Sequence, residues 1–248
     1  MPATDRLRRE REFHDRQAHA RASTFAREPQ RLCFSDADYL DHETWVQRAF
    51  GRLGDVRCKH ILDWGCGHGM AAVVLARRGA AVTACDLSPG YVAESKARAR
   101  ANGVAVHCCV ADAQRLPFAD DSFHAAWGHA ILHHLDVPVA ARELRRVLRP
   151  DGVAVLCEPW GGNPLLRIAR RWLSGHTADE KPLGSLQIRQ LKAVFGRVEV
   201  EGYQLVAMFP RTGLRTALLR HDERLLGRWP RLQRYCRYVV ITLRRGED

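Results

Sequence analysis

The stretch Ile61–Gly69, ILDWGCGHG, decides the fold that we expect for this chain. An apolar run is followed there by three alternating glycines, Gly65, Gly67 and Gly69. Glycine adopts backbone angles that are closed to other residues and lets the main chain approach a ligand closely. A strand, a glycine-rich turn and a helix in this order predict a cradle for a nucleotide cofactor.

A second apolar run ends in ACDLS and places Asp86 twenty-three residues after Asp63. A carboxylate at the end of such a strand is positioned to accept ribose hydroxyls. Asp63 is itself an unusual residue for a buried strand end unless it meets a polar ligand. The dinucleotide pattern G-x-G-x-x-G is broken, because Met70 stands where its third glycine would fall. A tight turn in some other α/β protein remains the alternative interpretation.

Length and composition favour one large α/β domain with additions. The chain has 248 residues, of which 46% are hydrophobic, and this is enough for a real core. Its first residues are charged where a signal peptide is apolar, and no segment approaches the roughly 18 apolar residues of a membrane span. We therefore expect a soluble, cytoplasmic protein. The eight cysteines include no C-x-x-C pair, so we expect reduced core thiols rather than zinc ligands.

The net charge of +11 is concentrated in three segments, residues 1–31, 160–182 and 208–237, while the remainder of the chain is neutral. In the third segment, arginines recur every three to five residues with leucines between them, which predicts an amphipathic helix. A solvated surface helix explains this pattern. Attraction of an acidic substrate, contact with anionic lipid and nucleic-acid binding are the alternatives.

The periodicity of apolar residues predicts alternating strands and helices after residue 58. Strands are expected at 59–64, 81–86, 104–110, 122–127, 153–157, 198–205 and 238–243, and helices at 70–78, 90–101, 136–149 and 185–195. This alternation requires right-handed crossovers and a parallel sheet covered on both faces. We expect a helical N-terminal cap over 1–58 and a cofactor domain over 59–248, with insertions at about 160–184 and 208–237.

Four stretches carry a resemblance to a known family: ILDWGCGHG, ACDLS, VADAQRLPFADDSFHAAW and LRRVLRPDGVAVLCEPW. They follow one another in the expected order across residues 59–160. Together they resemble the class I S-adenosylmethionine-dependent methyltransferases, and most closely the type 11 group that includes quinone-biosynthesis enzymes. The resemblance implies S-adenosylmethionine as cofactor. It also implies a Rossmann-like, mostly parallel seven-stranded sheet, with helices on both faces and an antiparallel last strand, but it does not indicate the substrate.

The resemblance also implies roles for individual residues. Asp63 and the glycine turn surround the methionine part of the cofactor, Asp86 holds the ribose, and Asp112 meets the adenine amino group. The cofactor-binding residues expected on this basis are Asp63, Gly65, Cys66, Gly67, Gly69, Asp86, Leu87, Asp112, Ala113 and Gly128. An aspartate that caps the following turn is the alternative interpretation of Asp112.

Methyl transfer is a direct displacement at an activated carbon, so alignment and desolvation of the reactants supply much of the rate. A general base is needed only if the acceptor must lose a proton. The candidates for this catalytic role are His133, His129 and Glu158, because they follow the fourth and fifth strands at the ligand-binding edge of the sheet. Histidines that cap or pack, and a Glu158 paired with an arginine, are the alternatives. We expect no metal site, because Asp136 is the only carboxylate near these histidines in the sequence.

Caps and insertions in this family usually close over the acceptor. His14, Tyr39, His42 and Trp45 in the N-terminal cap are therefore weak pocket candidates. Trp160, after the fifth strand, is expected either to form an apolar wall of the pocket or to pack its own loop.

The leading hypothesis is a methyltransferase acting on an oxygen, carbon or nitrogen of a small and possibly acidic molecule, in secondary or cofactor metabolism. We expect a monomer or a homodimer. A methyltransferase acting on RNA or another nucleic acid is disfavoured, because AAWGHA lacks the N/D-P-P-Y/W stretch that holds a target base. The remaining alternative keeps the fold without methylation, as a protein that catalyses elimination or cyclisation or that supports a partner.

Overall fold

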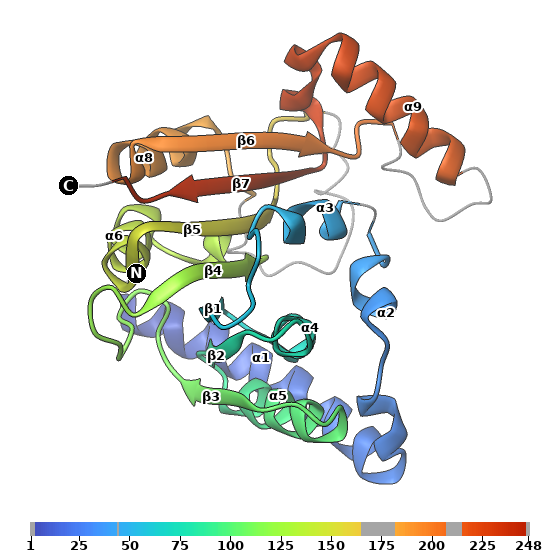
Figure 1. Ribbon diagram of the computed structural model, residues 1–248, viewed down its shortest axis with the longest axis vertical. Coiled ribbons are helices and arrows are strands. Elements are labelled where there is room, and N and C mark those ends of the chain that lie inside the picture. The colour runs from blue at the N-terminus through green and yellow to red at the C-terminus, as the bar shows by residue number, and fades with distance from the viewer. Residues whose placement is uncertain (1–2, 44, 165–181, 207–214, 247–248) are drawn as a thin grey trace.

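The computed structural model describes residues 3–43, 45–164, 182–206 and 215–246. Within these ranges, seven strands form one sheet in the order β3-β2-β1-β4-β5-β7-β6 (Figure 1). The strands are β1 His60–Trp64, β2 Ala81–Asp86, β3 Val106–Val110, β4 Phe123–His129, β5 Leu148–Pro159, β6 Arg197–Tyr203 and β7 Tyr238–Arg244. Neighbouring strands from β3 to β5 are parallel, whereas β7 is antiparallel to both β5 and β6. The predicted Rossmann-like sheet with an antiparallel last strand is thereby confirmed.

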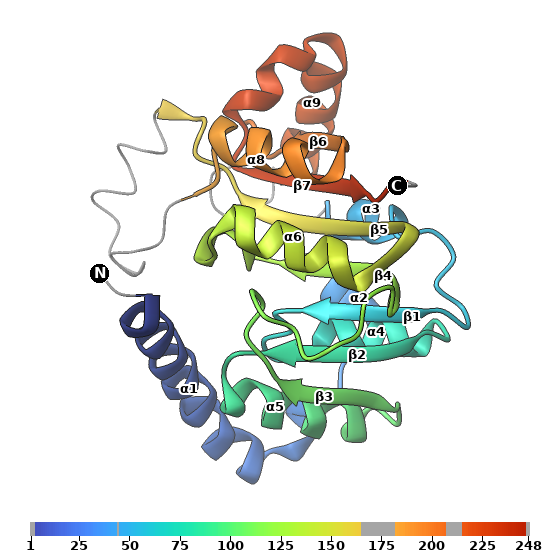
Figure 2. The same cartoon turned by 90° about the vertical axis from the view of Figure 1, so that its left-hand side faces the viewer.

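Helices cover both faces of the sheet and precede its first strand. The α-helices are α1 Ala3–Arg27, α2 Asp36–Leu40, α3 Val46–Gly51, α4 Met70–Arg77, α5 Pro89–Ala101, α6 Val137–Val147, α8 Ser185–Phe195 and α9 Arg215–Arg228, and the 3₁₀ helices are η1 Pro29–Leu32, η2 Leu132–His134 and η3 Pro230–Tyr235. One apolar core lies between the sheet and α3 and α4, and a second lies between the sheet and α6 and α8 (Figure 2). Two buried layers explain why the central strands are apolar on both sides.

Element boundaries differ from the sequence prediction by a few residues. The helix expected to run to Arg149 ends at Val147, and Leu148 is already extended. The cause is Pro150, because a proline disfavours helical geometry at the residue before it. The expected insertions fall partly on residues 165–181 and 207–214, which lie outside the described ranges. The amphipathic helix expected in the basic segment is present as α9.

The cysteines follow the prediction in part. All eight are free, and five of them are buried. Cys33 and Cys58 are exposed, so the expectation of core thiols was wrong for these two. Both precede the first strand, where no sheet covers them. No helix in the described part of the chain is both long enough and apolar enough to cross a membrane.

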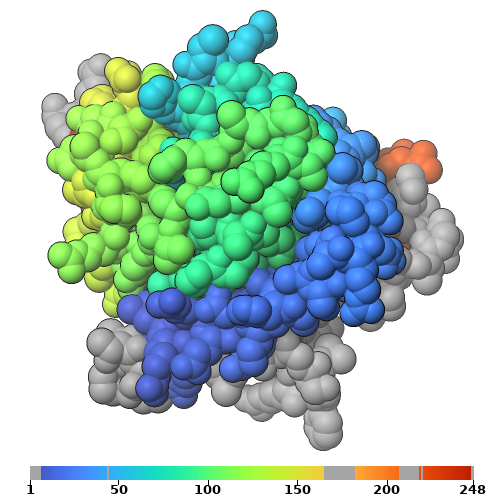
Figure 3. All heavy atoms as spheres, turned by 90° about the horizontal axis from the view of Figure 1, so that it is seen from below, coloured from blue at the N-terminus to red at the C-terminus, as the bar shows by residue number. Residues whose placement is uncertain are grey.

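Helix α1 lies along the side of the sheet toward which the arrowhead of β1 points (Figure 2). Polar contacts to α5 fix it there. The Asp15 carboxylate accepts hydrogen bonds from the Ser88 hydroxyl and from the Gly90 amide at the N-terminus of α5. One turn further along α5, Arg21 forms two hydrogen bonds with one oxygen of the buried Glu94 carboxylate, at 3.1 and 2.9 Å. These contacts hold the N-terminal cap against the edge of the sheet where the cofactor is expected. Figure 3 shows the blue surface of the cap in contact with the green surface of later residues.

Candidate cofactor and active site

The glycine turn after β1 takes the backbone geometry that only glycine adopts without strain. Gly65, Gly67 and Gly69 have φ angles of +70°, +50° and +79°. A Cβ atom at Gly65 would lie 2.7 Å from the Ile131 side chain, and one at Gly69 would lie 2.7 Å from the backbone Cα of Ser95. Glycine at positions 65 and 69 thus allows the turn to pack closely against neighbouring residues, whereas Gly67 has open space beside it.

Asp86, at the end of β2, organises the turn. One carboxylate oxygen accepts the Gly67 amide and the other accepts the Ser88 amide, both at 2.9 Å. Burial raises the pKa of Asp86, and these two amides partly offset the effect. Each carboxylate oxygen still has acceptor capacity, because it offers two lone pairs. The geometry therefore fits a carboxylate that accepts hydroxyl donors from a ribose.

A cavity of about 280 Å³ opens beside this turn. Six of the residues expected to bind the cofactor line it, namely Gly65, Gly67, Asp86, Leu87, Asp112 and Ala113. They come from the ends of β1, β2 and β3, where open α/β sheets bind ligands. Asp112 also accepts the Gln114 amide at 2.8 Å, so the turn-capping interpretation of this residue holds alongside its place at the cavity.

Four of the expected residues lie outside the lining of this cavity, namely Asp63, Cys66, Gly69 and Gly128. Asp63 is only 2% exposed, and its second carboxylate oxygen has no hydrogen-bond partner among the described residues. Burial raises its pKa to about 7, the Ala72 amide opposes this rise, and the charge of Asp86 adds to it. Asp63 therefore lies beneath the turn, against the start of α4.

Gly128 and Cys66 have packing roles in this geometry. A Cβ at Gly128 would lie 2.7 Å from the Leu156 side chain, so glycine allows β4 and β5 to pack closely. Burial raises the pKa of the Cys66 thiol well above its ordinary value. That thiol is therefore protonated and apolar in character.

His129 is the catalytic candidate that the structure places at the cavity. Burial, together with the nearby His42, lowers its pKa to about 4. The ring packs edge-on against Trp45, with 5.4 Å between the centroids. At neutral pH the imidazole is therefore uncharged and has a free lone pair.

The other two catalytic candidates, His133 and Glu158, pair with each other outside the cavity lining. His133 Nδ1 lies 2.7 Å from Glu158 Oε2. The other oxygen of this fully buried glutamate accepts the Ile131 and Leu132 amides at 3.0 and 2.7 Å. The expected pairing of Glu158 with an arginine was wrong, because these donors satisfy the carboxylate. The pair holds η2 in place at the rim of the cavity.

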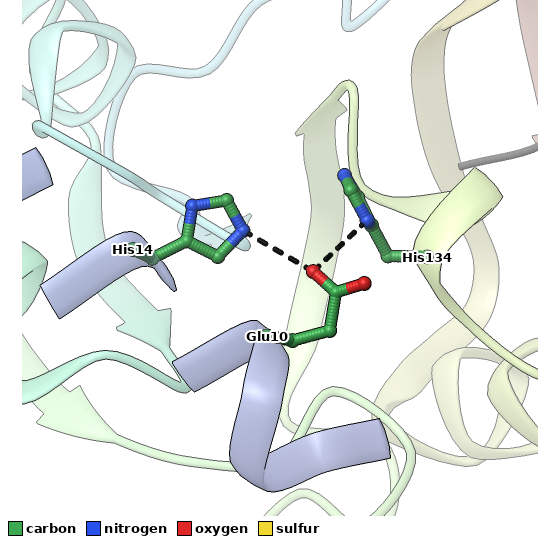
Figure 4. A group of neighbouring side chains, drawn as sticks. All are labelled: Glu10, His14 and His134. Atoms are coloured by element: carbon green, nitrogen blue, oxygen red, sulfur yellow. Dashed lines mark ion pairs between the residues drawn. The ribbon is translucent and has the colours of Figure 1, made fainter. Parts of the chain in front are cut away.

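Glu10, a cavity-lining residue that we did not single out, faces His134 and His14 at the cavity rim (Figure 4). The two histidines lower the pKa of Glu10 well below its usual range, with His134 having the larger effect. Burial by itself lowers the pKa of His14, but Glu10 and the charge of Asp86 outweigh this effect, so its pKa is raised. The expectation that Asp136 is the only carboxylate near these histidines was wrong, because Glu10 comes from a helix more than a hundred residues away. The spacing of Glu10 and His14, four residues apart on one helix face, was the available signal.

Two of the remaining cap candidates, Tyr39 and Trp45, take up core positions. The Tyr39 hydroxyl accepts a hydrogen bond from Trp127 Nε1 at 3.1 Å, and Trp45 is 1% exposed. Neither of them nor His42 lines the cavity, whereas His14 does. Trp160 Nε1 donates to the Arg234 carbonyl at 2.8 Å, which attaches its loop to η3.

Known proteins share this fold and this turn. A family profile described as "Methyltransferase domain" matches residues 62–156. Malonyl-(acyl-carrier protein) O-methyltransferase of Dechloromonas aromatica is 36% identical over 127 residues, which are 50% of this chain and 45% of that protein. Methyltransferase GfsG of Streptomyces halstedii is 39% identical over 115 residues, which are 44% of this chain and 41% of the relative. The chain thus spans about half the length of the curated relatives it matches.

Among solved structures, the [4+2]-cyclase SpnF has a TM-score of 0.57 at 23% identity, covering 82% of this chain and 80% of the cyclase. This likeness concerns the fold alone. The sheet order and the glycine turn define a Rossmann-like cofactor-binding domain. Residues 62–156 match the methyltransferase domain family, and about half of the chain is similar to curated methyltransferases. S-adenosylmethionine is the cofactor of this family.

Proposed function

We propose that this protein transfers a methyl group from S-adenosylmethionine to an oxygen, carbon or nitrogen of a small molecule in secondary or cofactor metabolism. The main support is Asp86, whose carboxylate holds the glycine turn through Gly67 and also lines the cavity. Gly65, Gly67 and Asp86 are proposed to hold the cofactor, with Asp112 and Ala113 beside the adenine. The cofactor supplies an activated methyl group on a sulfonium.

His129 is proposed to contact the acceptor. Its pKa of about 4 makes it a weak base at neutral pH. General-base catalysis is most effective when the pKa of the base lies near the working pH. We therefore propose that His129 accepts a hydrogen bond and orients the acceptor, and that the acceptor atom is nucleophilic without strong deprotonation.

The surface around the cavity favours a small acceptor over a polymer. Residues of the cap, including Glu10 and His14, line the cavity. One of the curated relatives named above carries malonyl-(acyl-carrier protein), a carboxylated acceptor, in its name. A carboxylated or otherwise acidic acceptor also agrees with the basic balance of this chain, +11 at pH 7.

The test measures formation of S-adenosylhomocysteine by the purified chain with a panel of carboxylate, phenol, amine and quinone-precursor acceptors. Asp86→Asn is expected to weaken cofactor binding in calorimetry by about 1–3 kcal/mol, or roughly 5- to 150-fold, through loss of charge-assisted hydrogen bonds. Asp55→Asn is the matched control, because that side chain is 71% exposed. If the cofactor binds but is never consumed with any acceptor, the proposed methyl transfer is wrong and a non-methylating reaction replaces it.

A further inference from the structure

Glu10, His14 and His134 form a cluster that the proposed methyl transfer does not use. Glu10 and His14 lie on one face of α1, and His134 ends η2. His14 and His134 both face one oxygen of the Glu10 carboxylate (Figure 4), and one ligand atom from each of the three residues lies within 4.8 Å of the others. Two histidines and one carboxylate are a ligand set found in zinc sites that keep a fourth position open.

Two distances within the cluster are compatible with ligands of one metal ion. Glu10 Oε2 lies 3.6 Å from His14 Nε2 and 3.3 Å from His134 Nδ1. A charge-assisted hydrogen bond between such groups is about 2.7–2.9 Å long. Ligand atoms on a tetrahedral zinc ion, with bonds of about 2.0–2.1 Å, are separated by about 3.3 Å. The observed spacing therefore matches ligand atoms arranged around an ion better than direct hydrogen bonds.

The polar atoms at the centre also lack other partners. Glu10 Oε2 and His134 Nδ1 are buried, and neither makes a hydrogen bond to the described residues. Buried polar atoms of this kind are rare unless they meet a ligand, an ion or water. A bound dication would satisfy both.

The fold holds the three residues in place from two sides. Asp15 and Arg21 attach α1 to α5. Glu158 accepts the amides of Ile131 and Leu132 and so fixes the 3₁₀ turn that carries His134. A site built on such supported elements is preorganised for binding.

We propose that Glu10, His14 and His134 bind one divalent transition-metal ion of the zinc class, with an open coordination position facing the cavity. Imidazole and carboxylate ligands suit this class, whereas Mg²⁺ and Ca²⁺ prefer oxygen alone. The ion would join the N-terminal helix to the rim of the sheet. Its open position would take water or an oxygen or nitrogen donor from a molecule in the cavity.

The experiment uses the full chain after dialysis against a chelator, without cofactor, so it does not depend on methyl transfer. Zn²⁺ titration by calorimetry is expected to show one tight site per chain, and Mg²⁺ none. Glu10→Gln and His134→Ala should each weaken that site by at least about 100-fold, since even the loss of an outer-shell partner costs 10- to 100-fold. His19→Ala on the same helix and His60→Ala, both exposed, are the matched controls and should keep it.

A second variant covers the case in which a substitution disturbs folding. His134→Cys keeps a metal ligand, so Co²⁺ is expected to bind and to give the sulfur-to-cobalt charge-transfer band that the original chain lacks. Absence of a tight site in the original chain, equal loss of binding in the His19 or His60 variant, or no new band with His134→Cys would overturn the proposal. The cluster would then be a metal-free ion-paired clamp.

Discussion

Replacing Gly69 by alanine probes the glycine turn at its most crowded point. The added Cβ would lie 2.2 Å from the Ser95 hydroxyl oxygen, 2.6 Å from its Cβ and 2.7 Å from its Cα. A hydroxyl can rotate away, but the Cα belongs to α5 and moves only with the helix. Gly69 also has a φ of +79°, which costs an L-residue about 1–2 kcal/mol.

The two effects add to a substantial loss of stability. Overpacking in a rigid environment costs about 1–3 kcal/mol. We therefore expect Gly69→Ala to lower the free energy of unfolding by about 2–5 kcal/mol in urea denaturation. For a chain of this size, each kcal/mol lowers the melting temperature by about 2–4 °C, so the expected decrease is about 4–20 °C.

Gly103→Ala is the matched control for backbone strain. Gly103 has a φ of +69°, but a Cβ there would meet nothing within 4 Å. This variant should lose only the conformational part, about 1–2 kcal/mol. Equal losses at Gly69 and Gly103 would refute the view that the turn is packed against α5, and a neutral Gly69→Ala would refute the turn geometry itself.

Three further predictions concern buried charged or titratable groups. Glu158→Gln should lower the free energy of unfolding by about 1–3 kcal/mol, because the charge-assisted hydrogen bonds to the carboxylate are lost. Urea denaturation at pH 7 measures this change, and an unchanged stability would contradict the buried pair with His133. The pKa of His129 falls to about 4 on folding, so between pH 6.5 and 4 the unfolded chain binds more protons than the folded chain. The stability of the original chain relative to His129→Phe should therefore fall by about 1 kcal/mol per pH unit as the pH drops from 6.5 to 4. A difference that does not change with pH would contradict the burial of this imidazole. The pKa of Asp63 rises to about 7 on folding, so between pH 4 and 7 the folded chain binds more protons than the unfolded chain. The original chain should therefore lose stability relative to Asp63→Asn as the pH rises from about 4 to 7, with a slope of similar size and opposite sign to that of His129. A constant difference would show that the carboxylate is solvated.

Much of the fold was predictable because local patterns specify it. The strands around the glycine turn are short apolar runs, and the helices between them end at Gly79 and at Asn102 followed by Gly103. Positive φ angles at Gly79 and Gly103 confirm these ends. Each of these features depends on residues that are close in the sequence.

The roles of individual site residues were harder to predict because they depend on which side of a strand end each residue faces. Asp63 lies one residue before the end of β1 and Asp86 ends β2, yet only Asp86 lines the cavity. Similarly, His133 and His134 are adjacent, but one pairs with the buried Glu158 and the other faces Glu10. Periodicity cannot separate such neighbours in a 3₁₀ turn, where alternation of faces does not apply.

The cap residues at the cavity could not be located from the sequence at all, because long-range polar contacts place them. The position of α1 depends on the hydrogen bonds that Asp15 accepts at the start of α5 and on the bonds from Arg21 to Glu94. Each contact joins positions more than seventy residues apart. Glu10 and His14 reach the cavity only because of this docking. The side of the cavity at the glycine turn therefore depends on backbone geometry within one loop, whereas the opposite side depends on hydrogen bonds to Asp15 and on the Arg21–Glu94 ion pair. Substitutions in α1 can thus change the lining of the cavity while the glycine turn stays intact.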